Sequence, residues 1–242
     1  GQTTFSKLRK TWSVLIEIDI MTQNSFPKLT DDNNKVALVE GDDSYTYSKV
    51  NRRIDRFATG LLDGRDDLKE ERIAFFMPAS LDYVTAMHGI WRAGGIAIPL
   101  NVASAVAELD HYLTSAGVTR MIANGKYQES LRELCAELHI ELVSSDDILA
   151  DEIAALPEII PERRGLMLFT SGTTNKPKGV VSTHKTIHAQ ITTLIEMQLE
   201  WKVDVVQIQG GRVAGSYFPI VKTREWAISK DQLIAQTQWT TF

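Results

Sequence analysis

The stretch 166-LMLFTSGTTNKPKGVV-181 carries the most information about the fold of this chain and about its chemistry. It begins as an apolar run, breaks into hydroxyl residues and glycine, passes through Lys-Pro-Lys-Gly and becomes apolar again. Closely approaching backbone N–H groups, hydroxyl groups and an ammonium group together match the oxygen atoms of a polyphosphate. The stretch therefore predicts a site for an anionic group directly after a buried strand.

The candidate binding residues of this stretch are its hydroxyl residues, its two glycines and its second lysine: Thr170, Ser171, Gly172, Thr173, Thr174, Lys178 and Gly179. Glycine permits backbone angles that other residues avoid and lets a ligand approach the backbone. The stretch is not a Walker A loop, which needs Gly-Lys followed by Ser or Thr. The alternative that these residues leave open is a polar surface loop that is rich in threonine.

The bulk composition is that of a globular protein. The chain has 242 residues, of which 43% are hydrophobic and 24% charged, and a chain of this length can bury a sizeable core. A net charge of -5 argues against a nucleic-acid partner, because such proteins are usually basic. The single cysteine, Cys135, excludes a disulfide framework and is expected to be a buried, inert thiol. No apolar run approaches the roughly 20 residues of a transmembrane helix.

Residues 1–35 are interpreted as a leader or accessory segment. The apolar run 13-SVLIEIDI-20 is interrupted by Glu17 and Asp19, and no small-residue cleavage site follows, so a secretory signal peptide is not expected. The alternatives are an amphipathic helix, a weak organelle-targeting segment, and extra upstream residues before a start at Met21. We expect a cytoplasmic protein, with an organelle matrix as the second compartment.

From residue 36 onward, strand patterns alternate with helical patterns. The expected strands are 36–40, 44–48, 72–77, 96–100, 119–124, 140–143 and 166–170. The expected helices begin at Ser48, Ser80 and Ser104, cover 127–138, and run from His184 to about Leu199 with Ser182 or Thr183 as the cap. This alternation predicts an α/β fold of parallel βαβ units with helices on both faces of the sheet. The segment 144–165 is expected to be a surface connection.

The phosphate-type stretch thus lies between a strand and a helix. Open α/β sheets bind their ligands at this place, outside the carboxyl ends of the strands.

Four stretches resemble signatures of the adenylate-forming (AMP-binding) superfamily, which includes acyl-CoA synthetases, luciferases and peptide-synthetase adenylation domains. The segment 170-TSGTTNKPKGV-180 resembles the phosphate-binding signature, and 91-WRAGGIAIPLN-101 resembles a second signature. Residues 44–62 and 72–90 resemble the strands and helices that accompany them. The resemblance covers residues 36 to about 201. It implies the N-terminal subdomain of an AMP-binding domain at 36–202, incomplete, followed by a divergent tail at 203–242.

The resemblance also implies a reaction, that of an acid-thiol ligase of the acyl-CoA synthetase type. A small-molecule carboxylic acid attacks the α-phosphate of ATP to give an acyl-adenylate, and coenzyme A then takes the acyl group. The loop 170–179 would hold the β- and γ-phosphates, with Mg²⁺ sharing their charge. Lys178 is the first residue expected in this role, whereas Lys176 falls at a variable position and is expected to face solvent. The resemblance assigns no catalytic residue and no metal ligand to a position of this chain.

The family's later signatures have no counterpart after Lys202. Three hypotheses follow: a truncated product, a short paralogue, or one segment of a split enzyme whose partner chain supplies the C-terminal half. The functional alternatives are a non-catalytic nucleotide- or phosphate-binding fragment and an amino-acid adenylation domain.

The histidines give weaker signals. His184 and His188 lie four residues apart on one expected helix, as metal ligands can, but a local structural role for His184 is favoured. His88 and His111 are expected to be packing or surface residues. Trp91, which precedes a Gly-Gly turn, is expected to pack in the core.

Overall fold

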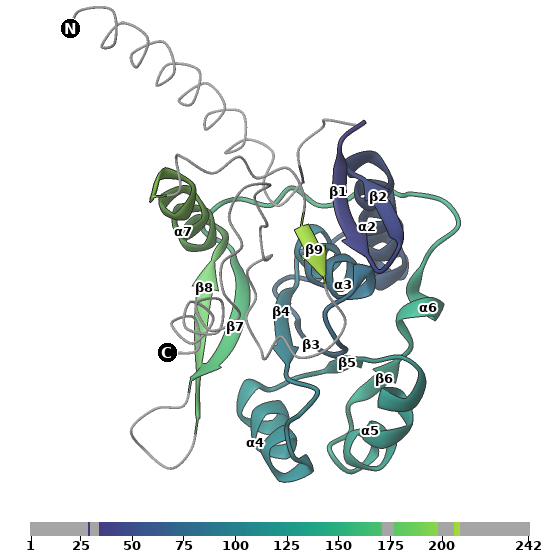
Figure 1. The fold of residues 1–242 in the computed structure, drawn as a ribbon. Coiled ribbons are helices and arrows are strands. Elements are labelled where there is room, and N and C mark those ends of the chain that lie inside the picture. Colours follow the sequence, from purple (N-terminus) through teal and green to yellow (C-terminus); the bar gives the residue numbers. More distant parts are fainter. Residues whose placement is uncertain (1–28, 30–33, 171–176, 198–205, 209–242) are drawn as a thin grey trace, which may run out of the picture.

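The computed structural model describes residue 29 and residues 34–170, 177–197 and 206–208, and it confirms the α/β class. Its main sheet contains β3 (Arg72–Phe76), β4 (Ile96–Leu100), β5 (Arg120–Ile122), β6 (Glu141–Val143), β7 (Arg164–Thr170) and β8 (Lys178–Thr183). The strand order is β6-β5-β3-β4-β7-β8 (Figure 1). All neighbouring strands are parallel except β7 and β8, which are antiparallel.

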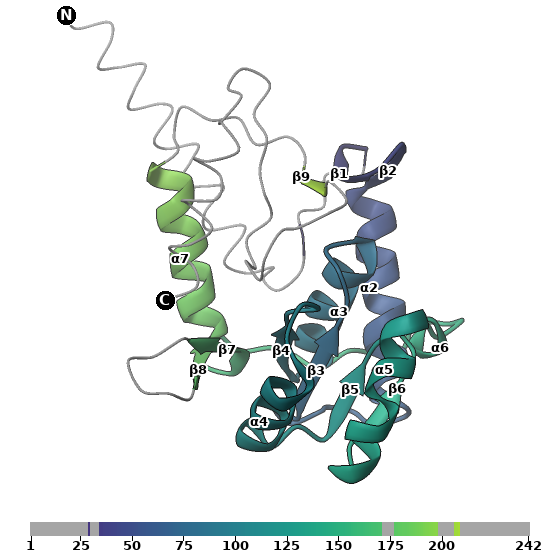
Figure 2. The same cartoon turned by 60° about the horizontal axis from the view of Figure 1, so that its bottom comes forward.

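Helices cover both faces of this sheet. The helices α2 (Tyr47–Leu62), α3 (Leu81–Arg92) and α7 (His184–Met197) pack on one face, and α4 (Val106–Ala116) and α5 (Gly125–Glu137) on the other. In Figure 2, α3 and α4 lie on opposite sides of β3 and β4. Strand β3 supplies both cores, because Ile73 and Phe75 point to the first face and Ala74 and Phe76 to the second. In the described part of the chain, no helix is long and apolar enough to cross a membrane.

A small second sheet packs against α2. It contains β1 (Val36–Glu40), β2 (Asp43–Thr46) and β9 (Val206–Ile208) in the order β2-β1-β9. β1 and β2 form an antiparallel hairpin, with Gly41 at a φ of 59° in the turn, and β9 pairs with β1 in parallel. Its core residues are Ala37, Leu38, Val50 and Ile54. Strand β9 thus ties three residues of the predicted tail 203–242 to the N-terminal hairpin.

Two of the predicted helix caps are confirmed and two are wrong. Ser80 accepts a hydrogen bond from the backbone N–H of Tyr83, and Thr183 accepts one from Thr186. Helix α2, however, is capped by Thr46 rather than Ser48, since β2 ends at Thr46 and the chain turns there.

Helix α4 begins at Val106, with Ala105 rather than Ser104 at the N-cap. The carboxylate of Glu108 accepts the backbone N–H of Ala105 at 3.2 Å, whereas the N-cap residue has no side chain that could cap the first turn.

The expected surface connection 144–165 contains one helical turn, α6 (Ser145–Ile148), which contacts α2. Ile148 is buried, and a Cβ added at Gly60 of α2 would lie 1.5 Å from the carbonyl oxygen of Ile148. Arg56 donates to the carbonyl oxygen of Ala150 at 2.6 Å in the same contact. Gly60 is therefore required by the close approach of two backbones.

The largest correction concerns the segment after the phosphate-type loop. Residues 178–183 form the strand β8, so the loop joins two antiparallel strands and α7 follows only after β8. Strand β8 lies at the edge of the six-stranded sheet, and its Val180 and Val181 are 51% and 38% exposed. The predicted position of the loop at the carboxyl end of β7 is correct, whereas the predicted direct connection to a helix is wrong.

Strand β7 is held in place by a contact at Gly165. The indole N–H of Trp91 donates to the carbonyl oxygen of Gly165 at 2.6 Å, and Trp91 is buried as predicted. The ring of His184 lies against the same residue, so that a Cβ at position 165 would be 2.7 Å from it. The rings of Trp91 and His184 also meet edge to face, with centroids 5.7 Å apart. His184 is therefore a buried packing residue, in line with the favoured structural role.

Replacing Gly60 with alanine is expected to destabilise the fold by about 1–3 kcal/mol, because the added methyl group would collide with backbone atoms of α6. At a solvent-exposed helix position, the same change stabilises the fold by about 1 kcal/mol. The sign of the change in stability therefore distinguishes a close backbone contact from an exposed position. Urea unfolding followed by circular dichroism measures the change.

Arg52→Ala is the matched control for Gly60→Ala, since Arg52 is exposed on the same helix. We expect its free energy of unfolding to stay within about 0.5 kcal/mol of the parent value. A Gly60→Ala protein that is as stable as the parent would contradict the described contact between α2 and α6.

His184 is expected to make stability depend on pH. Burial, followed by the nearby charge of Arg163, lowers its pKa from 6.5 to about 4, while Glu70 acts in the opposite direction. The folded protein favours the neutral imidazole over the charged one. The contribution of His184 to the free energy of unfolding is therefore fully present above pH 6.5 and is lost as the pH falls from 6.5 towards 4. The loss amounts to about 3 kcal/mol, from 1.36 kcal/mol for each pKa unit.

Chemical denaturation between pH 7.5 and 4 measures this slope, and His184→Leu is the comparison. We expect the variant to have a lower stability at pH 7.5 and a flatter dependence on pH above 4.5. Equal slopes for the two proteins would show that His184 is not the titrating group.

Candidate functional site

The two ends of the phosphate-type loop lie side by side. Thr170 is the last residue of β7 and Lys178 the first of β8, and the two are register partners in the antiparallel pair. The hydroxyl of Thr170 also lies 3.4 Å from the carbonyl oxygen of Lys178. The structure thus brings together these two predicted site residues at the carboxyl edge of the sheet.

The side chain of Lys178 is exposed at this edge. Within the described residues, no carboxylate lies at salt-bridge distance from its ammonium group. An ammonium group in this position can therefore neutralise an anion at the loop without first breaking an ion pair.

Gly179 has a different structural role from the one predicted. It lies in β8 opposite Phe169, and its φ is not in the positive range in which glycine is preferred. A Cβ at this position would lie 2.1 Å from the terminal methyl group of Met167. Glycine at 179 therefore makes room for the side chain of Met167, and its contact with a ligand stays a prediction.

The remaining predicted residues of the loop lie outside the described residues. They are Ser171, Gly172, Thr173 and Thr174, together with Lys176, which was expected to face solvent.

Helix α4 contacts both arms of the loop. Nε2 of His111 lies 3.0 Å from the carbonyl oxygen of Pro177, which directly precedes Lys178. The ring of Tyr112 lies 4.5 Å from the ring of Phe169, which directly precedes Thr170. From the sequence alone, His111 is expected to be a packing or surface residue, and no role is predicted for Tyr112. The signal that could have found them is topological, since α4 follows β4 and β4 is the parallel neighbour of β7.

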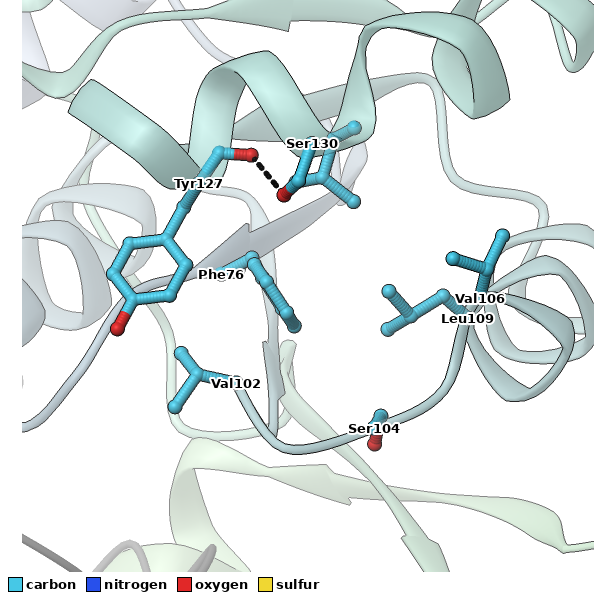
Figure 3. A pocket seen from close by; sticks show the side chains of 8 residues that line it. Phe76, Val102, Ser104, Val106, Leu109, Tyr127 and Ser130 are labelled. Carbon is cyan, nitrogen blue, oxygen red and sulfur yellow. Dashed lines mark hydrogen bonds between the residues drawn. The ribbon is translucent and has the colours of Figure 1, made fainter.

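A groove of about 310 Å³ lies between α4 and α5, beyond the carboxyl ends of β3 and β4 (Figure 3). Its lining residues are Phe76, Val102, Ser104, Val106, Leu109, Tyr127, Ser130 and Leu131. The lining contains no charged side chain, so the groove suits an uncharged, largely apolar group and not a triphosphate. The groove and the loop lie at the same edge of the sheet, with α4 contributing to both.

Two ion pairs with several hydrogen bonds each lie at the opposite end of β7. Arg163 donates two hydrogen bonds of 2.8 Å to the carboxylate of Asp67, and Arg164 binds Glu70 through its side chain and its backbone N–H. These hydrogen bonds lower the pKa of Asp67 and of Glu70, against the opposing effect of burial. Both carboxylates are thus fixed as structural anions at the amino edge of the sheet, away from the loop.

The weaker candidates are placed as follows. His184 and His188 both lie on α7, with His184 buried against Trp91. Within the described part of the chain, no group of three potential metal ligands occurs. Cys135 is buried as predicted, and burial raises the pKa of its thiol.

Comparison with known proteins places this geometry in a family. The sequence model of the family described as AMP-binding enzyme matches residues 28–222, beyond both boundaries, 36 and 202, that the motifs suggested. A probable CoA ligase of Humulus lupulus is 33% identical over 151 residues, which are 55% of this chain and 25% of that protein. A mitochondrial malonate–CoA ligase of Homo sapiens is 30% identical over 188 residues, 72% of this chain and 32% of that protein.

Among solved structures, ATP-bound MatB from Rhodopseudomonas palustris superposes with a TM-score of 0.63 at 24% identity, covering 72% of this chain and 37% of that one. At this identity the likeness shows the fold alone. The chain thus spans about a quarter to a third of the curated relatives that it matches. Since the family match covers most of the chain and the fold agrees, the chain belongs to the AMP-binding enzyme family.

Proposed function

We propose that the loop from Thr170 to Gly179 binds the β- and γ-phosphates of ATP in an acyl-activating ligase of the acyl-CoA synthetase type. The observation that carries this proposal is the pairing of Thr170 with Lys178 at the carboxyl edge of the sheet, with the exposed Lys178 at the base of the loop. The sequence between them, Ser171 to Pro177, adds hydroxyl groups and a glycine.

The chemistry asked of this chain is binding and charge neutralisation. The carboxylate of the acid attacks the α-phosphorus of ATP, the bond to the β-phosphate oxygen breaks, and pyrophosphate leaves with the electron pair. The acyl-adenylate then passes its acyl group to the thiol of coenzyme A, releasing AMP. Catalysis of such a transfer depends mainly on positioning and on electrostatic stabilisation. Lys178, with Thr170 and Ser171, would hold the departing pyrophosphate, and Mg²⁺ bound to the nucleotide would share its charge.

The substrate is proposed to be a small carboxylic acid. The names of the human and plant relatives, malonate–CoA ligase and CoA ligase, support an acid-thiol ligase and make malonate the first acid to test. By the resemblance, the adenine and ribose contacts lie in signatures that this chain does not match. A partner chain that supplies these contacts is proposed as one alternative, beside a truncated product and a short paralogue. A cytoplasmic location, with an organelle matrix as the second choice, stays a prediction.

Lys178→Ala is expected to weaken the binding of magnesium pyrophosphate by about tenfold, which corresponds to 1.4 kcal/mol and to one charge-assisted hydrogen bond. The physical reason is the loss of the ammonium group at the base of the loop. Isothermal titration of the full chain with magnesium pyrophosphate measures the change.

Lys185→Ala is the matched control, because Lys185 lies on α7 with a 73% exposed side chain and only a 3.9 Å contact with Glu162. It removes the same charge at a different place and should leave the affinity unchanged. An equal loss of affinity for magnesium pyrophosphate in both variants would point to a general charge effect. An unchanged affinity in Lys178→Ala would contradict the proposed role of the loop.

Acid activation is tested separately, by exchange of labelled pyrophosphate into ATP. We expect exchange that depends on malonate, exceeds that with acetate, and is lost in Lys178→Ala. Binding of pyrophosphate without exchange for any acid would instead assign this chain a non-catalytic phosphate-binding role.

A further inference from the structure

We propose that His111 is a positioning residue for the phosphate-binding loop, acting through its hydrogen bond to the carbonyl group of Pro177. This inference rests on the proposed function, since it concerns the same loop.

The hydrogen bond determines the state of the imidazole. A carbonyl oxygen can only accept, so Nε2 of His111 carries the proton and donates to Pro177 at 3.0 Å. Pro177 directly precedes β8. Helix α4 is thus joined by a hydrogen bond to the residue at which the loop ends.

The bond also orients Lys178. The peptide unit between Pro177 and Lys178 is planar, and in the trans form its C=O and N–H groups point in opposite directions. Fixing the carbonyl group of Pro177 on His111 therefore also fixes the peptide plane that leads into Lys178. Lys178 is held from its other side by its register pairing with Thr170.

Helix α4 also contacts the other arm of the loop, at the end of β7. Tyr112 packs on Phe169, with ring planes inclined by 33°, and the ring of His111 lies 6.5 Å from that of Phe169. Each contact of α4 thus falls one residue before a predicted phosphate ligand, Phe169 before Thr170 and Pro177 before Lys178.

The helix is a firm support for such contacts. On its inner face Leu109, Leu113 and Ala116 are buried in the core beneath the sheet, at 2%, 1% and 0% exposure. A shift of α4 would open this core, so the position of His111 is set by packing and not by the loop. His111 therefore connects the loop to a helix whose position is set by the packing of the core.

The test compares His111→Gln with His111→Leu and His111→Ala. Glutamine keeps a side-chain N–H donor, whereas leucine fills space without a donor and alanine removes both. Ser115→Ala, an exposed change on the same helix, is the matched control. Two quantities are measured on the full chain: amide hydrogen exchange of the segments 164–170 and 177–183 without ligand, and the affinity for magnesium pyrophosphate. Exchange of β3 serves as the internal reference for global stability.

We expect the leucine and alanine variants to exchange the amides of segment 177–183 about two- to tenfold faster and to bind pyrophosphate about two- to tenfold more weakly, the effect of one ordinary hydrogen bond. The glutamine variant should lie close to the parent, and exchange of β3 should not change. If all three variants behave like the parent, the proposal is overturned. If glutamine is as damaging as leucine, the role is packing and not donation, and the proposal is likewise overturned.

Failure of the proposed function gives a different result. A parent chain that does not bind pyrophosphate removes the phosphate-binding role of the loop. The exchange rates of segment 177–183 in the same variants still decide whether His111 holds Pro177.

Discussion

The contact of Trp91 and His184 with Gly165 is the constraint on which the rest of the structure depends. Trp91 comes from α3 and His184 from α7, so one glycine of β7 joins the strand to both helices. Any larger side chain at position 165 would push the imidazole away and separate α7 from the sheet. The phosphate-type loop follows the carboxyl end of β7. By fixing the position of β7, this contact therefore also fixes the point at which the loop begins.

The two ends of β7 serve different purposes. Its amino end is held by forked hydrogen bonds from Arg163 to Asp67 and from Arg163 to the carbonyl oxygen of Gly94. Its carboxyl end is held by Tyr112 and, across the hairpin, by His111. Bidentate ion pairs with good geometry are the kind that contribute to rigidity, and binding loops work best on a rigid scaffold. The strand is thus anchored at one end and presents the loop at the other.

Much of this architecture follows from local sequence. The run 73-IAFF-76 is apolar because a parallel strand is covered on both faces. Ser80 has the hydroxyl group that a helix N-terminus needs. The pattern of 178-KGVVST-183 does not predict a strand, because the stretch is short and ends in Thr183, which caps the following helix. Its pairing with β7 depends on partners eight or more residues away and not on its own pattern.

The candidate site shows the same division. Thr170 and Lys178 could be named from composition and resemblance, because hydroxyl and ammonium groups near glycine are typical of phosphate sites. The contact of His111 with Pro177 joins residues that are 66 positions apart in the sequence. The local sequence around either residue does not predict this contact. Long-range contacts of single residues are set by how α4 packs on the sheet, and a single sequence carries no periodic signal for them.

The register of the hairpin explains why the motif extends beyond the loop itself. Side chains alternate along a strand, so a slip of one residue in β8 would turn Lys178 and Gly179 to the opposite faces of the sheet. Glycine at 179 favours the observed register, since a Cβ there would lie 2.1 Å from the terminal methyl group of Met167, which occupies the diagonal partner position. Gly179 therefore has a packing role in the sheet, and its contact with a ligand stays a prediction. In the observed register Lys178 lies opposite Thr170, at the base of the loop.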